Sequence, residues 1–251
     1  MRKSFVFGSL LALAALPFGP AAQSQSVAKG QVTLRPVIEL FTSQGCSSCP
    51  PADALLTSYI NRADVVALSM PVDYWDYLGW KDTLASPAFT ARQRAYARAR
   101  GDGAVYTPQV VINGLAHAVG SRQSDIDAAI LATVKKLAAL AVPLTVITTG
   151  GEIVIEAGAA AGGKAEGATL WLAVIDPAVE VPIQRGENRG RTVAYHNVVR
   201  SMTPVGMWHG EAMKVSIDPR TIGRVKGQTC AVLLQQGANG PIIAAQMMAD
   251  K

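Results

Sequence analysis

Two cysteines, Cys46 and Cys49, stand two residues apart and are the side chains best suited to chemistry in this sequence. Cysteines at this spacing can close a disulfide across the first turn of a helix, and Pro50 or Pro51 suits the first helical position. The positive end of such a helix would stabilise a thiolate on Cys46, with Cys49 lying deeper as the resolving partner. The pair therefore predicts thiol–disulfide exchange through a mixed disulfide, with Cys46 and Cys49 as catalytic residues and no cofactor.

Three other roles for the cysteine pair stay open. A purely structural disulfide is common in exported proteins, and it would suit a non-catalytic binding module. A zinc site needs about four ligands, but there is no second cysteine pair and the three histidines show no ligand spacing. Copper handling is chemically feasible for soft thiolates, although no Met-rich or His-rich tract accompanies them. We expect no metal site and rank the structural disulfide as the main alternative to exchange.

A second feature is Pro108, which directly precedes an apolar run at 109–112. X-Pro bonds have only a small preference for trans, so a cis Thr107–Pro108 bond is an expectation. It would present backbone beside the dithiol, where an extended substrate can pair; an ordinary trans proline at a strand start is the alternative. We predict Pro108 in the catalytic set and Thr107, Trp75 and Trp80 as substrate-binding residues. The alternative for the two tryptophans is that they pack the aromatic block 74–80 onto the sheet, because large aromatic side chains dominate core packing.

The remaining polar clusters are more ambiguous. A set between residues 185 and 200 fits either an anion-binding or docking loop or a solvated hairpin tip. Four arginines fall in a predicted helix at 87–100 and are interpreted as a solvated face: Arg92, Arg94, Arg98 and Arg100. Asp73 and Asp76 are candidate proton acceptors for Cys49. Cys230, in an apolar run, is expected to be a buried, inert thiol.

The N-terminus has the layout of a secretory signal peptide over residues 1–24. Arg2 and Lys3 precede an uncharged apolar run at 5–16, and small residues follow at 21–24; the run is too short to span a bilayer. Without Arg2 and Lys3 the 23 basic residues fall to 21 against 18 acidic ones, a balance too weak to indicate nucleic acid. We expect a periplasmic or secreted protein, without stable membrane insertion after cleavage, whose partner is a protein or small-molecule thiol or disulfide.

Two regions differ in their patterns. Residues 33–141 alternate strand-like runs with helical segments at 52–61 and 124–140, interrupted by a helical and aromatic insertion at 70–105. Asn113–Gly114 is a hairpin turn signal. From residue 143 to 251 short β-rich runs recur between Gly and Pro clusters, which is typical of a sandwich. The fold class expected is α/β plus all-β, with a boundary at 141–143.

The order of strand, Cys-x-x-Cys, helix, strand, insertion, Thr-Pro, strand, hairpin and helix resembles the thioredoxin-like fold. More narrowly, four segments resemble the exported family of unknown function numbered DUF1223: ELFTSQGCSSCPPAD at 39–53, VDYWDYLGWKD at 72–82, YTPQ at 106–109 and GENRGR at 186–191. The resemblance implies a thioredoxin-like domain followed by a β-rich domain, and it supplies no substrate. One departure is Met70–Pro71 before the second segment, where the family pattern is expected to have a histidine.

Overall fold

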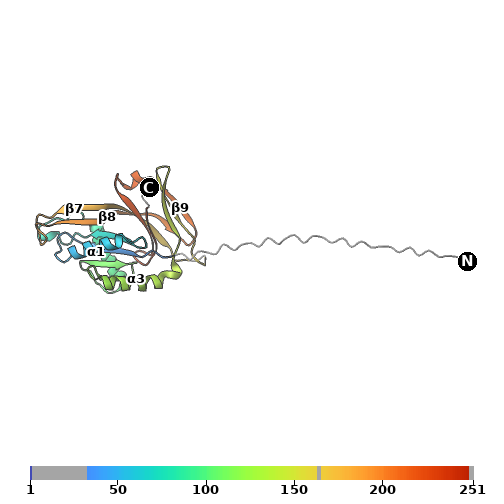
Figure 1. Cartoon of the computed structure of the whole chain (residues 1–251), viewed down its shortest axis with the longest axis horizontal. Helices are drawn as coiled ribbons and strands as arrows, with labels where there is room; N and C mark the ends of the chain where they lie inside the picture. The colour runs from blue at the N-terminus through green and yellow to red at the C-terminus, as the bar shows by residue number, and fades with distance from the viewer. Residues whose placement is uncertain (2–32, 163–164, 249–251) are drawn as a thin grey trace. The chain divides into compact units, whose positions relative to one another are not determined.

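The structure, a computed structural model, describes Met1 and residues 33–162 and 165–248 (Figure 1). The α-helices in these ranges are α1 (Pro50–Ile60), α2 (Pro87–Arg100) and α3 (Gln123–Leu137), with short 3-10 turns η1 (Asp76–Leu78), η2 (Ala138–Leu140) and η3 (Pro219–Ile222). The strands are β1 (Val37–Thr42), β2 (Val66–Pro71), β3 (Gln109–Ile112), β4 (Ala116–Val119), β5 (Leu144–Thr149), β6 (Glu152–Ala157), β7 (Ala168–Pro182), β8 (Thr192–Trp208), β9 (Met213–Ile217), β10 (Thr229–Gln236) and β11 (Ile242–Met247).

Eight of these strands form one mixed sheet in the order β11-β10-β7-β8-β2-β1-β3-β4, and the other three form a small sheet, β5-β6-β9. Strand β1 lies parallel to β2 and antiparallel to β3. Strand β8 joins β2 in parallel at a single register pair, Val198 with Ser69. That pair connects the strands before residue 143 to those after it.

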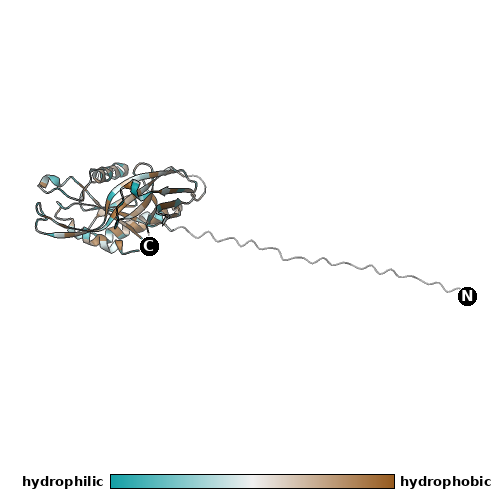
Figure 2. Cartoon of the chain, turned by 90° about the horizontal axis from the view of Figure 1, so that it is seen from above, coloured by the Kyte–Doolittle hydropathy of each residue, from teal (hydrophilic) through white to brown (hydrophobic). Residues whose placement is uncertain are grey.

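Helices cover both faces of the β1 region because alternate side chains of a strand point to opposite faces. Ile38 and Leu40 pack with residues of α1 and α3 in one core cluster. Val37 and Phe41 pack on the other face, in a cluster that includes Phe89 and Tyr96 of α2. In Figure 2 hydrophobic segments, drawn in brown, run through the strands of the folded body. Strand β1 is therefore buried on both faces, and the loop that follows it starts from a rigid point.

The described part of the β-rich region does not form a sandwich of its own. Its strands β7, β8, β10 and β11 extend the sheet that contains β1, and the described residues from 33 onward belong to one compact unit. Only β5, β6 and β9 make a second sheet, which packs on β7 and β10 through one core cluster. The eight residues of β10 are all buried, and a strand that is apolar on both faces carries no signal of the sheet to which it belongs.

Most sequence-predicted elements are present, with shifted ends. Helix α2 has the predicted bounds, and the turn at Asn113–Gly114 joins the hairpin of β3 and β4. Not all runs of the β-rich region are short, because β7 is one 15-residue strand with register shifts near Trp171 and Ile175. The signal peptide predicted at 1–24 lies, apart from Met1, outside the described residues. Among the described residues, no helix is long and apolar enough to cross a membrane.

Candidate functional site

Cys46 and Cys49 form a disulfide with a Cα–Cα distance of 5.4 Å. The bond closes the short loop that leads from β1 to α1, and Cys49 is the N-cap residue of α1, with proline at the first helical position. The carbonyl of Cys49 accepts hydrogen bonds from the backbone N–H groups of Ala52 and Asp53, at 2.8 and 3.0 Å. The sulfurs therefore lie at the end of a helix whose dipole favours a thiolate once the bond is reduced.

Both cysteines are buried, with exposed fractions of 1% for Cys46 and 0% for Cys49. The expectation that Cys46 is the more accessible of the two has no support in this difference. An attacking sulfur must approach along the S–S axis, so the closed arrangement seen here shields the bond from large thiols. Exchange at this site requires that the covering residues move.

One cover comes from the connection between β7 and β8, residues 183–191, which we term the tip segment. The buried side-chain amide of Asn188 donates hydrogen bonds to the carbonyls of Gln44 and Cys46, at 3.0 and 2.8 Å. The carboxylate of Glu187 accepts a hydrogen bond of 3.1 Å from the backbone N–H of Ser47. Of the two interpretations of the 185–200 cluster, docking against the cysteine loop therefore describes the tip segment.

The two predicted tryptophans flank the same loop. Trp75 Nε1 donates to Thr107 Oγ1 at 2.8 Å, and Trp80 Nε1 donates to Gln44 Oε1 at 2.7 Å. A Cβ on Gly45 would lie 3.0 Å from the Cβ of Trp75, so a larger residue there requires the Trp75 backbone to shift. The structure thus brings Trp75, Trp80 and Thr107 together around the cysteine loop, where they both pack and make specific polar contacts.

Pro108 lies on the other side of the helix start, and the Thr107–Pro108 peptide bond is cis, as expected. The carbonyl of Pro108 accepts a hydrogen bond from the backbone N–H of Gly120, at 2.9 Å. A Cβ on Gly120 would lie 3.0 Å from both Pro108 Cβ and Ala52 Cβ, so glycine allows the proline to approach α1 closely. Cys46, Cys49 and Pro108 are thus held against the same end of α1.

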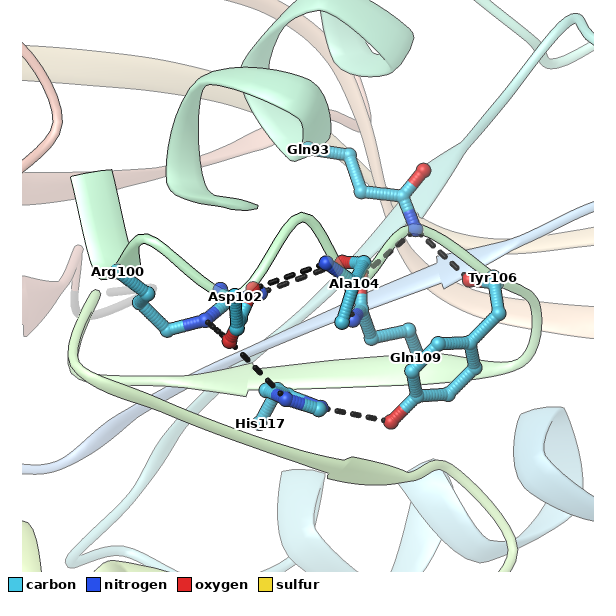
Figure 3. Close-up of polar contacts among 7 residues, drawn as sticks. All are labelled: Gln93, Arg100, Asp102, Ala104, Tyr106, Gln109 and His117. Atoms are coloured by element: carbon cyan, nitrogen blue, oxygen red, sulfur yellow. Dashed lines mark hydrogen bonds and ion pairs between the residues drawn. The ribbon is translucent and has the colours of Figure 1, made fainter. Parts of the chain in front are cut away.

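A polar network fixes the segment that precedes Thr107 (Figure 3). Asp102 contacts both Arg100, at 2.7 Å, and His117 Nε2, at 3.3 Å, and His117 Nδ1 lies 2.8 Å from the hydroxyl of Tyr106. Gln93 donates to the carbonyl of Tyr106 at 2.8 Å. The Arg100 guanidinium and the Ala104 N–H lower the pKa of Asp102 to about 2. Burial lowers the pKa of His117, an effect that Arg100 increases and Asp102 opposes.

A buried acid that sequence reasoning missed lies one helical turn after Cys49. Asp53 is 3% exposed, and neither carboxyl oxygen has a hydrogen-bond partner among the described residues. Burial raises its pKa to about 7; the nearby Thr42 hydroxyl offsets part of the rise and Asp82 adds to it. Residues four apart share a helix face, so the spacing Cys49–Asp53 was the available signal.

The two acids proposed from sequence as proton acceptors, Asp73 and Asp76, accept hydrogen bonds from residues other than Cys49. Asp73 accepts a hydrogen bond from the hydroxyl of Thr90, and Asp76 accepts one from the backbone N–H of Asp82. Asp82 is 4% exposed, and its carboxylate accepts a hydrogen bond of 2.7 Å from the backbone N–H of Gln44. This bond fixes the start of the cysteine loop. Burial raises the pKa of Asp82.

A cleft of about 680 Å³ opens between α1 and the start of β8, and Asp53 lies in its wall. Pro50, next to Cys49, lines the cleft together with Arg191 and His196. The cleft therefore borders the residue that carries this buried carboxyl. Within the described residues, no group of three or more His, Cys, Asp or Glu side chains is arranged to hold a metal ion.

Comparison with known proteins places these features in a wider group. The family model DUF1223, described as a protein of unknown function, matches residues 37–235. A crystal structure of a protein from Agrobacterium tumefaciens is 38% identical, with a TM-score of 0.76, over 86% of this chain and 94% of that one. HBP35 of Porphyromonas gingivalis is 14% identical, with a TM-score of 0.62, over 87% of this chain and 76% of that one, a likeness of fold alone. No curated protein matches.

Proposed function

Because the chain belongs to the DUF1223 family, whose description assigns no activity, its function rests on its own residues, and we propose that it is an exported thiol–disulfide oxidoreductase. The observation that carries the proposal is the disulfide between Cys46 and Cys49, closed directly before α1 with Cys49 as N-cap. This position lowers the pKa of a thiol and so favours the thiolate, which is the reactive form in exchange. An oxidising compartment such as the periplasm would maintain the bond between turnovers.

The reaction conserves electrons without a cofactor. In the reducing direction the Cys46 thiolate attacks a substrate disulfide, forms a mixed disulfide and releases one substrate thiolate. The Cys49 thiolate then attacks Cys46 Sγ, which releases the second substrate thiolate and closes the Cys46–Cys49 bond. In the oxidising direction the same steps run in reverse. A protein or small-molecule thiol supplies the electron pair in the first case, and a partner disulfide accepts it in the second.

Asp53 supplies proton transfer in this scheme. Cys49 must lose a proton before it attacks the mixed disulfide, and a carboxyl with a pKa of about 7 exchanges protons at neutral pH. Its position four residues after Cys49 on α1 puts both side chains on one helix face. We propose Pro108, Thr107, Trp75 and Trp80 as the surface that the substrate contacts. We also propose that β2-β1-β3-β4 with α1 and α3 form a thioredoxin-like unit.

A second candidate is a binding module in which the disulfide is a structural brace. The exposed fractions of 1% and 0% for the two cysteines favour it, since structural disulfides resist reduction. Exchange and bracing differ in reduction potential, and this difference decides between them.

The test is the reduction potential of the purified protein, measured by thiol trapping in glutathione buffers. Cys46→Ser and Cys49→Ser serve as matched controls, because each removes the bond and keeps the other thiol. A potential between roughly −120 and −270 mV supports exchange, since dithiol catalysts span that range. A potential below about −300 mV overturns it in favour of the brace.

A further inference from the structure

A second cleft, of about 570 Å³, separates one face of α2 from the middle of β7 and β8. Its helix side carries Ala88, Ala91 and Ala95, which repeat at spacings of three and four and so share one face. Methyl side chains leave the space between helix and sheet unfilled. The cleft is not lined by Cys46, Cys49, Pro108 or Asp53, and the proposed redox chemistry does not use it.

Three arginines line this cleft, and no carboxylate does: Arg92, Arg98 and Arg200. Two buried residues hold the Arg92 guanidinium in place. Its Nε donates to Glu39 Oε1 at 2.7 Å, and its Nη2 donates to the hydroxyl of Tyr96 at 2.6 Å. Glu39 is wholly buried, so the orientation of the Arg92 guanidinium is fixed by the core. Its Nη1 has no acceptor among the described residues.

The other two arginines differ in how far their charge is balanced. Arg200 lies 3.6 Å from the carboxylate of Asp176. Arg98 is exposed and makes no ion pair with any described residue. The cleft therefore holds about one uncompensated positive charge, supplied by Arg98, beside the fixed guanidinium of Arg92.

Trp171 gives the wall of the cleft its aromatic part. Its ring centroid lies 6.0 Å from the guanidinium carbon of Arg92, and its buried Nε1–H has no hydrogen-bond acceptor among the described residues. Phe89 and Met202 extend the apolar lining around it.

We propose that this cleft binds a small organic monocarboxylate whose body is apolar or aromatic. Arginine forks match the two oxygens of a carboxylate, and a single uncompensated charge suits a monoanion better than a phosphate dianion. The alanine, Phe89, Trp171 and Met202 surfaces accept the apolar body, as binding clefts with few polar groups usually do. The site is independent of the disulfide, so its ligand is bound in either redox state.

The experiment measures binding to the full chain by calorimetry and by tryptophan fluorescence. The probes are phenylacetate, its neutral analogue phenylacetamide, acetate and inorganic phosphate. Phenylacetate is expected to bind saturably and the other three at least about tenfold more weakly, because each lacks the charge, the apolar body or the right valence. Equal binding of phenylacetamide or tighter binding of phosphate overturns the proposal, as does the absence of saturable binding of phenylacetate.

Matched variants locate the site. Arg98→Gln and Ala91→Leu are expected to weaken phenylacetate binding by at least about tenfold, the first through lost charge and the second by filling the cleft. Arg94→Gln is the control, since Arg94 is exposed on the same helix but does not line the cleft. Loss of binding in Arg94→Gln equal to that in Arg98→Gln overturns the assignment. Arg92 is left unchanged, because its loss would strand the buried Glu39 carboxylate.

Discussion

The side-chain amide of Asn188 donates a hydrogen bond of 2.8 Å to the carbonyl of Cys46, across 142 positions of the chain. The same amide donates to Gln44, so one buried side chain holds both ends of the segment that leads into the disulfide. The strand that positions it, β8, reaches this place because it pairs with β2. The β-rich region thereby shapes the cysteine loop, and four predictions follow from this and related contacts.

Asn188→Ala is expected to expose the disulfide. The carbonyls of Gln44 and Cys46 lose their donor, which costs about 1–3 kcal/mol for a buried group left unsatisfied, and the tip segment detaches more readily. Thiol-trapping kinetics with dithiothreitol should show faster reduction of Cys46–Cys49. Arg189→Ala, at an exposed neighbour in the tip segment, should leave the rate unchanged. An unchanged rate in Asn188→Ala would mean that the tip segment does not restrict access.

Asp53→Asn is expected to stabilise the protein above pH 7. In the unfolded chain Asp53 ionises near pH 4, whereas folded Asp53 keeps its proton up to about pH 7. The folded state therefore binds the extra proton between these values, and the free energy of unfolding falls as pH rises through that window. An asparagine does not ionise, so the variant avoids this loss. Relative to the parent, its free energy of unfolding should be higher by up to about 4 kcal/mol above pH 7 and unchanged below about pH 4.

Denaturant unfolding at pH 4 and pH 8 measures this difference. Asp125→Asn is the control, at an acid that is exposed on α3. A stability gain in Asp53→Asn that is equal at both pH values would contradict a raised pKa. If Asp53 also transfers protons for Cys49, the variant should exchange disulfides more slowly near pH 7 while keeping the reduction potential close to that of the parent.

Arg92→Met is expected to destabilise the fold strongly. The Arg92–Glu39 pair is buried, with side-chain exposures of 9% and 0%, and the variant leaves Glu39 without its counter-charge. Breaking a buried pair in this way costs roughly 3–5 kcal/mol. Arg94→Met, on the exposed side of α2, should change stability by less than about 0.5 kcal/mol. The double variant Glu39→Leu with Arg92→Met should regain much of the loss, since replacing both charges removes the desolvation penalty.

Asp102→Asn is expected to lower the pKa of His117 further. Burial and Arg100 already lower that pKa, and Asp102 opposes them from 3.3 Å. Since the folded pKa lies below that of the unfolded chain, the folded protein loses stability as pH falls below about 6.5. NMR titration of the His117 ring protons in the parent and in the variant measures the shift. A rise in the pKa of His117 in the variant would show that Asp102 does not stabilise the imidazolium.

The local chemistry of the cysteine segment was accessible from sequence. The spacing of Cys46 and Cys49, with prolines after them, predicted the disulfide at the start of a helix, and the structure has α1 beginning at Pro50. The strands around Val37 and Gln109 and the helix at 87–100 followed from periodicity and breakers. These features depend on interactions between residues that are close in the sequence, so a short stretch of sequence is enough to predict them.

Contacts between distant segments were decided only by the tertiary structure. The tertiary structure brings Asn188 over Cys46, buries Asp53 and pairs Arg92 with Glu39. These contacts depend on how β8 joins the sheet and how α2 packs on it. Strand β10 is buried along its whole length, and such a strand indicates burial but no particular neighbour, so the sequence did not show which sheet the β-rich strands join. The residue types therefore determined which chemistry this protein can carry, and packing determined which groups are buried, paired and able to use it.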